Sequence, residues 1–403
     1  MKLIAERTHL LAALKAVCHL ADSKAKIPML STVRLRTEGS RLLIAATDND
    51  AYAEAEIAAE VERQGAACIA ADVLLRMTGN FPEGAQVSID AGDALATVKA
   101  GRSRYQPHVL PATDFPSAFV ATGNVARFML MPEEVRRLFD IPRPAAAKGM
   151  KDRPYLEGVY LHTSEDDAAL WGVAGSGYVL LAANVEAPEG AQDLPKKLEP
   201  DGTRPGRARG VMVPLESVAH LLRLGEVPLE IEAGDNVLAV RGAGSGVKVS
   251  YATRLLENRY PPYERVVPPL EGPRITVEAG AFAAAVKRLA DMAGNDERPV
   301  AMEWGEEGDL SLWLDDHSDG IYGTEMLEIE SRVGTGRVGI RSGFIMKAIE
   351  AVGRGHVEIW CAGEDKPVRF RNLDDADLVA VAAPQTLRRR PHQGAAIAAG
   401  EAA

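Results

Sequence analysis

The sequence has few cysteines. Cys18, Cys68 and Cys361 are its three, and they lie far apart in the chain. This spacing argues against a disulfide framework, and against a zinc site, because a zinc site needs close pairs of cysteines. We expect all three to be buried and to behave as small hydrophobic residues.

Long hydrophobic runs are also missing. No apolar stretch approaches the roughly 18–20 residues that span a bilayer. Glu6, Arg7 and His9 interrupt the first apolar residues, so no signal peptide is indicated. We therefore expect a cytoplasmic protein without membrane contact.

Basic residues are fewer than acidic ones. The chain has 46 lysines and arginines and 57 aspartates and glutamates, which gives a formal net charge of −11. A protein that coats nucleic acid by bulk electrostatics usually has a basic domain, so the balance argues against that class. It leaves open a protein that confines its positive charge to one face. The contents of 46% apolar and 26% charged residues are ordinary for a folded globular chain.

No catalytic constellation is recognisable. The eight histidines are scattered, and no clustered pair of acids is present. The glycine-rich segment 242–246 is followed by Val247 where a dinucleotide site needs glycine, so we interpret it as a turn. Ser176, between Gly175 and Gly177, lacks the glycine spacing of a nucleophile elbow. These absences predict a binding or scaffold protein that is not an enzyme and needs no cofactor.

The segment 315–320 is the remaining candidate for chemistry. Asp315, Asp316 and His317 could bind a divalent ion, and an enzyme acting there is an alternative hypothesis. The segment lacks the spacing and the final glutamate of a calcium loop, and it separates two strand-like stretches. We favour a solvated hairpin turn and predict no metal site.

A long internal repeat dominates what is present. A helix-compatible apolar stretch, a short break and an alternating strand occur three times, with the strands beginning at Val87, Leu229 and Val357. These starts are 142 and 128 residues apart, far more than the roughly 20–50 residues of a solenoid repeat, so they indicate three similar domains. The helical stretches are residues 71–77, 214–222 and 342–349.

A strand followed by a helix precedes each of these copies. Each domain therefore consists of two half-units, and each half-unit has one helix and several strands. Alternating residues at 33–36 and 41–44 around a turn indicate antiparallel hairpins. The fold class is predicted to be α+β, with three tandem domains. The added strands are residues 2–4, 127–130 and 274–277, and the added helices are 8–14, 132–138 and 279–286.

The repeat also gives domain boundaries. We place the domains at residues 1–121, 122–268 and 269–387. The linkers 118–123 and 268–273 are short, which predicts a fixed arrangement of the domains. The polar, proline- and glycine-rich insertion 194–210 is expected to be a mobile surface loop, and residues 388–403 a disordered tail.

Lysine and arginine recur at corresponding places on or beside the predicted helices. Taken singly, such residues usually belong to a solvated face. Their recurrence raises the alternative that the helices face a common axis, as in a ring, and present cations to phosphate groups. The residues are Lys15, Lys24, Lys26, Arg76, Arg136, Arg137, Arg143, Lys148, Lys151, Arg153, Arg223, Lys287, Arg288 and Lys347.

Several segments, in order, resemble the bacterial DNA polymerase III beta sliding clamp family. The resemblance covers residues 1–387, and few unrelated proteins would match so many segments in order. The segments are residues 1–3 with Glu6 and Arg7, then 27–30, 46–48, 81–85, 101–105, 110–116, 155–159 and 259–268.

The resemblance implies the DNA clamp fold. In that fold each chain has three domains, with helices inside and antiparallel sheets outside, and two copies close head to tail into a ring. Such a homodimer encircles duplex DNA without sequence preference, and weak phosphate contacts allow it to slide. The implied function is a processivity factor that tethers DNA polymerase and binds the clamp loader and repair proteins through short peptide motifs.

Three sets of site residues follow from the repeat and the resemblance. For DNA contact we expect Lys24, Arg76, Arg137, Lys151, Arg153, Arg223 and Lys347. For the dimer interface the resemblance implies Tyr105 and Met292. For an apolar cleft that receives partner peptides it implies Gly177, Leu180, Pro261, Arg265, Val266, Val381 and Pro384.

The sequence departs from the family in this cleft. Residues 175–180 replace the family's Thr-Asp-Gly-His-Arg-Leu, and residues 383–387 replace its terminal Met-Pro-Met-Arg-Leu. The loss of methionine and arginine removes adaptable apolar area and a hydrogen-bond donor, which predicts altered partner binding. The alternative function is therefore a clamp paralogue that acts as a protein-interaction platform.

Overall fold

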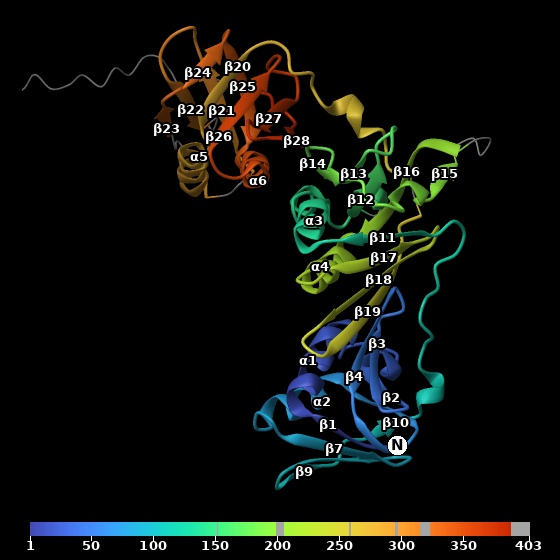
Figure 1. Cartoon of the computed structure of the whole chain (residues 1–403). Coiled ribbons are helices and arrows are strands. Elements are labelled where there is room, and N and C mark those ends of the chain that lie inside the picture. The colour runs from blue at the N-terminus through green and yellow to red at the C-terminus, as the bar shows by residue number, and fades with distance from the viewer. Residues whose placement is uncertain (151, 199–204, 258, 295–296, 315–322, 388–403) are drawn as a thin grey trace, which may run out of the picture. The chain divides into compact units, whose positions relative to one another are not determined.

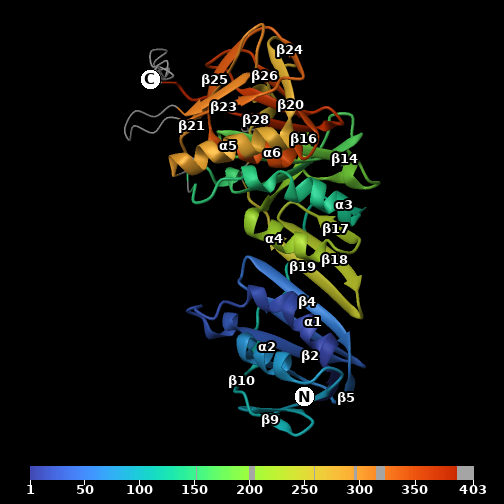
Figure 2. The same cartoon turned by 90° about the vertical axis from the view of Figure 1, so that its left-hand side faces the viewer.

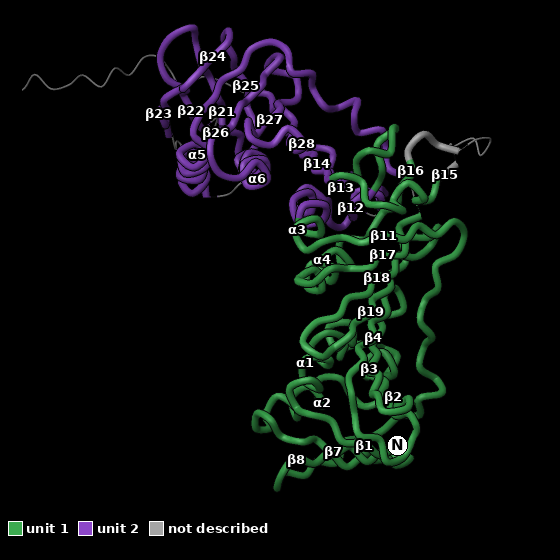
Figure 3. Tube along the Cα trace, in the orientation of Figure 1, with its two compact units in different colours: residues 1–136, 162–170, 186–257 green, residues 137–161, 171–185, 258–403 purple. Residues whose placement is uncertain are grey.

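The computed structural model describes residues 1–150, 152–198, 205–257, 259–294, 297–314 and 323–387 (Figure 1). The acidic segment 315–320, the tail 388–403 and Lys151 lie outside these residues, so the predictions made for them remain predictions. The chain forms two compact units (Figure 3). Unit 1 contains residues 1–136, 162–170 and 186–257, and unit 2 contains residues 137–161, 171–185 and 258–403.

Two antiparallel sheets dominate unit 1. One has the strand order β5-β1-β7-β8-β9, and the other has the order β10-β6-β2-β3-β4-β19-β18-β17-β11. The strands are β1 (Lys2–Glu6), β2 (Thr32–Glu38), β3 (Arg41–Thr47), β4 (Ala51–Ala58), β5 (Glu60–Arg63), β6 (Ala66–Ala70), β7 (Gln86–Ala91), β8 (Ala96–Ala100), β9 (Ser103–Tyr105), β10 (Val109–Leu110), β11 (Ala126–Leu130), β17 (Leu229–Ala233), β18 (Val237–Gly244) and β19 (Val247–Arg254).

Helices α1 (Arg7–Val17), α2 (Ala71–Asn80) and α4 (Leu215–Leu224) lie together on one side of these sheets (Figure 2). The first helix shows why the sequence folds this way. The Glu6 carboxylate accepts a hydrogen bond of 3.0 Å from the His9 backbone N–H, which caps the first turn. The residues that α1 buries are spaced three and four apart, so one apolar stripe packs against the sheet. They are Leu10, Ala13, Leu14 and Val17.

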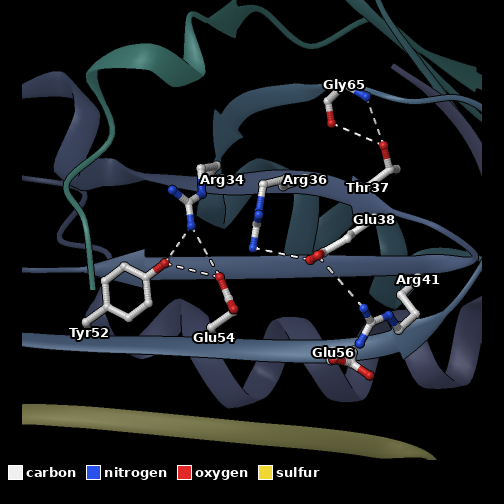
Figure 4. A network of polar contacts seen from close by, with 9 residues as sticks. All are labelled: Arg34, Arg36, Thr37, Glu38, Arg41, Tyr52, Glu54, Glu56 and Gly65. Atoms are coloured by element: carbon white, nitrogen blue, oxygen red, sulfur yellow. Dashed lines mark hydrogen bonds and ion pairs between the residues drawn. The ribbon is translucent and has the colours of Figure 1, made fainter. Parts of the chain in front are cut away.

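The opposite face of the longer sheet carries paired charges. Because strand side chains alternate, Leu35 is buried while Arg34 and Arg36 point to this other face. The Arg34 guanidinium donates to the Tyr52 hydroxyl at 2.6 Å and to the Glu54 carboxylate at 3.2 Å (Figure 4). Arg41 and Lys248 on the same face likewise pair with the Glu56 carboxylate, at 3.1 and 3.3 Å.

The linker after the first sheet is fixed to the same face. The Arg34 guanidinium lies 5.0 Å from the centre of the Phe115 ring, and Phe115 meets Tyr52 edge-on at 6.4 Å. Further along, Arg254 lies 5.1 Å from the centre of the Phe119 ring. These cation–π and aromatic contacts hold the linker against the sheet.

Part of the insertion 194–210 is a hairpin, so the prediction of a surface loop is wrong at both ends. Strand β15 (Lys196–Leu198) pairs antiparallel with β16 (Pro205–Pro214), with Lys196 opposite Arg209. The polar sequence hides the start of β16. That strand becomes apolar only at Val211, Met212 and Val213, which are buried.

Unit 2 contains the strand run β14-β28-β27-β26-β20-β24 and a sheet of order β23-β22-β21-β25. Helices α5 (Ala279–Ala293) and α6 (Ser342–Val352) belong to the same unit. Strands β12 (Gly158–Thr163) and β13 (Ala169–Gly175) have residues in both units. The other strands are β14 (Val179–Glu186), β20 (Arg274–Glu278), β21 (Pro299–Trp304), β22 (Leu310–Leu314), β23 (Thr324–Leu327), β24 (Ser331–Val333), β25 (Gly336–Arg341), β26 (His356–Cys361), β27 (Val368–Asn372) and β28 (Asp375–Ala382).

The structure confirms the α+β fold and the repeated elements. Each of the predicted helical stretches lies in a helix, although the helix expected at 132–138 is α3 (Pro132–Val135), which continues as a π-helix over Arg136–Asp140. The three cysteines are free; Cys68 and Cys361 are buried as predicted, whereas Cys18 is half-buried. None of the described helices is both long and apolar enough to cross a bilayer.

Because Gly172 has no side chain, the backbone at Leu138 can pack directly against it. A Cβ on Gly172 would lie 1.8 Å from the Leu138 carbonyl oxygen, whereas a Cβ on Gly79 in α2 would meet nothing within 4 Å. We expect Gly172→Ala to lower the free energy of unfolding by about 2 kcal/mol or more, because the backbone must shift. Gly79→Ala should leave it unchanged or raise it by up to about 1 kcal/mol. Denaturant unfolding followed by circular dichroism measures both, and equal midpoints would contradict this packing.

Candidate functional site

One strand pair brings three of the predicted cleft residues together. Leu180 in β14 lies directly opposite Val381 in β28, and the two side chains are 7% and 4% exposed. The ladder continues past the strand, because the Ala383 N–H donates to the Tyr178 carbonyl at 2.7 Å. Pro384 follows at once and is half-buried. Leu180, Val381 and Pro384 are therefore neighbours, as a shared cleft requires.

Gly177 has a backbone role beside this strand pair. It occupies the turn before β14 with a φ of +86°, in the left-handed region that glycine adopts without strain. No atom lies within 4 Å of the position a Cβ would take, so the space beside Gly177 is open.

An aromatic pair next to the turn was missed by sequence reasoning. Tyr178 is 52% exposed and stacks on Phe344, with ring centres 5.6 Å apart and planes at 14°. The Arg341 guanidinium lies 5.9 Å from the Tyr178 ring centre and 5.5 Å from that of Phe344. In the sequence, Arg341 and Phe344 are three positions apart at the start of α6, so they lie on the same side of the helix. Their contact with Tyr178 could not be predicted from this spacing. We call these three residues the aromatic group.

The segment 261–266 lies beyond a tyrosine stack. Tyr260 is buried and stacks on Tyr160 at 5.1 Å, and its hydroxyl lies 3.3 Å from where a Cβ would stand on Gly175. Burial raises the pKa of Tyr160 to about 12, so its phenol stays neutral. Pro261, Arg265 and Val266 are exposed at the surface, and their place in the cleft stays a prediction.

Most of the described cations predicted for DNA contact are exposed. Arg76 in α2 has a side chain 71% exposed and pairs with Asp72 at 3.1 Å, one helical turn away. Lys24, Arg153 and Arg223 are exposed as well, while Lys347 in α6 is half-buried. Exposure is what a phosphate contact needs, and the role of these residues remains a prediction.

Arg137 has a structural partner within the chain, and its place in the DNA set stays a prediction. Its guanidinium donates to both Asp375 oxygens at 2.7 Å and, through Nε, to the Asn184 carbonyl at 2.6 Å. The hydrogen bonds to Asp375 raise the pKa of Arg137 and lower that of the Asp375 carboxyl. Both side chains are only 26% exposed. These hydrogen bonds connect Arg137, which precedes β12, to Asn184 in β14 and to Asp375 in β28.

The two residues predicted for the dimer interface are exposed, each in its own unit. Tyr105 is 41% exposed in β9, an edge strand, and its ring lies 5.8 Å from that of Phe81. Met292, near the end of α5, is 59% exposed. An exposed edge strand leaves backbone groups free to pair with another chain.

Comparison with known proteins gives the class. The family profile "DNA polymerase III beta subunit, N-terminal domain" matches residues 1–119. The chain is 32% identical to the beta sliding clamp of Caulobacter vibrioides (strain NA1000 / CB15N) over 311 residues, which are 75% of this chain and 78% of that protein. It is 24% identical to the beta sliding clamp of Escherichia coli (strain K12) over 393 residues, which are 96% and 100% of the two chains.

Solved structures agree. The DNA polymerase sliding clamp from Caulobacter crescentus superposes with a TM-score of 0.84 at 27% identity, covering 96% of this chain and 100% of that one. Sequence and fold together define a DNA polymerase accessory protein with the clamp fold. The chain belongs to the bacterial beta sliding clamp family. No cluster of three or more metal-ligating side chains occurs in the described part of the chain.

The Arg137–Asp375 pair predicts a pH-dependent contribution to stability. Asp375→Asn should lower the free energy of unfolding by about 2 kcal/mol near neutral pH, because a charge-assisted bidentate pair is lost. The Asp375 pKa in the folded protein lies below its unfolded value of about 3.9, so the contribution is present above about pH 4. It disappears as the pH falls through the folded value.

Urea unfolding at several pH values tests this. Asp365→Asn is the matched control, since Asp365 is 82% exposed and pairs with Lys366 at the surface, and it should change stability by less than about 0.5 kcal/mol. A gap between the wild type and Asp375→Asn that stays constant down to about pH 2 would contradict the pairing.

Proposed function

We propose that this chain is a DNA sliding clamp, in which two copies form a ring around duplex DNA and tether a polymerase during replication or repair. The observation that carries the proposal is the similarity along the chain, with a TM-score of 0.84 over 96% of its length to a DNA polymerase sliding clamp. Its role would be that of a non-catalytic processivity factor in the cytoplasm.

The physical argument is enclosure. A closed ring stays on DNA by topology, so its contacts with phosphate groups can be weak, and weak contacts independent of sequence permit sliding. The net charge of −11 would keep DNA away from the outer surface, provided that cations gather in the hole. Lys24, Arg76, Arg153 and Arg223 are exposed and suited to that role.

The three-domain division at residues 1–121, 122–268 and 269–387 is part of the proposal. In this arrangement the edge of one chain near Tyr105 would meet the other chain's surface near Met292. Both side chains are exposed, as an interface between separate chains needs before assembly.

Partner proteins would bind at the cleft formed by Leu180, Val381 and Pro384. Polymerase, clamp loader and repair proteins would each insert apolar side chains of a short peptide there. The aromatic group would border this cleft. It presents flat rings and one guanidinium in the region where the family has histidine and arginine, so the set of accepted peptides should differ.

A protein-interaction platform that no longer encircles DNA is the second candidate. The observation that favours it is the altered cleft, in which Ala383 and Gln385 replace the family's methionines. Retention on DNA separates the two functions, because a platform needs no ring.

Retention on circular DNA tests enclosure. Loaded with a clamp loader, the protein should stay on a nicked circular plasmid and leave after the plasmid is cut once, since a ring slides off a free end. Gel filtration of the labelled protein with its DNA measures this. Equal retention on both forms, or on neither, would contradict enclosure and favour the platform.

A peptide titration tests the cleft. We expect the double variant Ala383→Met with Thr386→Arg to bind a clamp-binding peptide about tenfold more tightly than the wild type, because one buried methionine contributes about 1–2 kcal/mol. Fluorescence anisotropy measures the affinity.

The control for this titration is Ala376→Met, at the other end of β28, which adds the same side chain at an exposed site. It should leave the affinity unchanged. If the double variant also binds like the wild type, the cleft has been placed wrongly.

A further inference from the structure

A cavity of about 230 Å³ lies between α1 and α4 in unit 1. Its floor is the strand pair β4–β19, where Ala53 lies opposite Tyr251. Its walls are the two helices, which lie on the same side of that strand pair (Figure 2). We call this cavity the α1–α4 pocket. Its volume is that of about eight waters, suited to a small hydrated ion rather than to a drug-sized ligand.

The lining of the α1–α4 pocket is basic on both walls. Lys15 and His19 come from the α1 side, and His220 and Arg223 come from α4. No carboxylate is among the described residues that line it. Lys15 and Arg223 are permanent cations exposed to solvent, so an anion can approach them.

The two histidines form a close pair. Their ring centres lie 4.0 Å apart, and the His220 ring also lies 5.4 Å from that of Tyr251. The Arg223 Nη1 lies 3.4 Å from His220 Nδ1. A guanidinium can only donate, so Nδ1 accepts and the neutral ring carries its proton on Nε2. His220 is half-buried and lines the pocket.

Both imidazoles are neutral near pH 7. Burial, then His19 and Arg223, lower the pKa of His220 to about 3, and burial followed by Arg223 lowers the pKa of His19. The remaining groups nearby do not reverse this. The Asp48 carboxylate raises the pKa of His19, but by less than burial and Arg223 lower it. Burial, and to a lesser extent Asp48 and Glu216, raise the pKa of Tyr251 to about 12, so its phenol stays neutral.

We propose that the α1–α4 pocket binds a phosphate group between Lys15 and Arg223, and that the His19–His220 pair takes up a proton as the anion binds. The anion offsets the burial and the cationic repulsion that otherwise keep this pair neutral. The proton goes to His19, because His220 Nδ1 already accepts a hydrogen bond from Arg223. A divalent metal ion does not fit, because the two permanent cations repel it.

The source of the phosphate is either free phosphate or the DNA backbone, and only the second rests on the proposed function. In both cases the direction with pH is the same. A bound anion raises the histidine pKa values, so the affinity rises as the pH falls, by up to about tenfold per pH unit for each proton taken up. The pocket would thus tighten its hold on phosphate under mildly acidic conditions.

The test titrates the full chain with sulfate, whose charge stays constant over this range, and with inorganic phosphate. Binding is measured by NMR of histidine-labelled protein at about pH 5.5 and about pH 7.5, with ionic strength held constant by chloride. We expect sulfate to bind at least about fivefold more tightly at the lower pH, with the signals of His19 and His220 shifting together. Equal affinity at the two pH values, or no shift of these signals, would overturn the proposal.

Variants assign the effect to the pocket. His19→Gln, at the more exposed position, should remove most of the pH dependence, and His19→Asn gives the same readout if the first variant folds poorly. Arg223→Gln should weaken sulfate binding at both pH values. His108→Gln and Arg63→Gln are matched controls outside the pocket and should bind like the wild type. Controls that weaken binding as much as the pocket variants would contradict the assignment.

Retention on circular DNA at the same two pH values separates the sources. If retention resists salt better at the lower pH in the wild type but not in His19→Gln, the phosphate belongs to DNA. If sulfate binding depends on pH and retention does not, the pocket takes free phosphate. Failure of retention at every pH with intact sulfate binding would overturn the proposed function and leave this pocket standing.

Discussion

The backbone ladder between β4 and β19 is the interaction on which the arrangement of unit 1 depends. It joins strands nearly 200 residues apart in sequence, from Lys248 opposite Glu56 to Thr253 opposite Ala51. It makes one sheet from two repeat modules and so sets α1 beside α4. A slip of one residue would turn every side chain to the other face of the sheet and would remove the floor of the α1–α4 pocket. The β14–β28 ladder has the same role in unit 2, where it sets Leu180 opposite Val381.

The two faces of the sheet that contains β4 and β19 differ in how their charged residues are paired. On the side of the sheet away from the helices, Glu56 accepts from both Arg41 and Lys248, at 3.1 and 3.3 Å. On the helix side, Arg223 and Lys15 line a pocket without a carboxylate among its described residues. An acidic chain can thus keep unpaired positive charge on one face, because its acidic residues neutralise the cations elsewhere. Exposed pairs contribute little to stability, so their main effect is on where free charge remains.

The sequence predicted those parts of the fold that depend on local pattern. The repeated apolar stretches became helices because residues three and four apart, such as Leu10 and Leu14, form a buried stripe. The polar start of β16 was missed because its pairing with β15, not its own pattern, makes it a strand. The pairing of Arg137 with Asp375 could not be predicted, because the two residues lie 238 positions apart. The aromatic group was missed for a similar reason, since Tyr178 and Phe344 meet only in the folded chain.

Electron microscopy of the purified protein with a short DNA duplex tests the central claim most directly. The mass of one chain is 43.1 kDa, and the account predicts closed rings of two chains with the duplex passing through the hole. Helices should line that hole in the averaged images. Single chains at high concentration, or duplex bound to the outer surface of the particle, would contradict it.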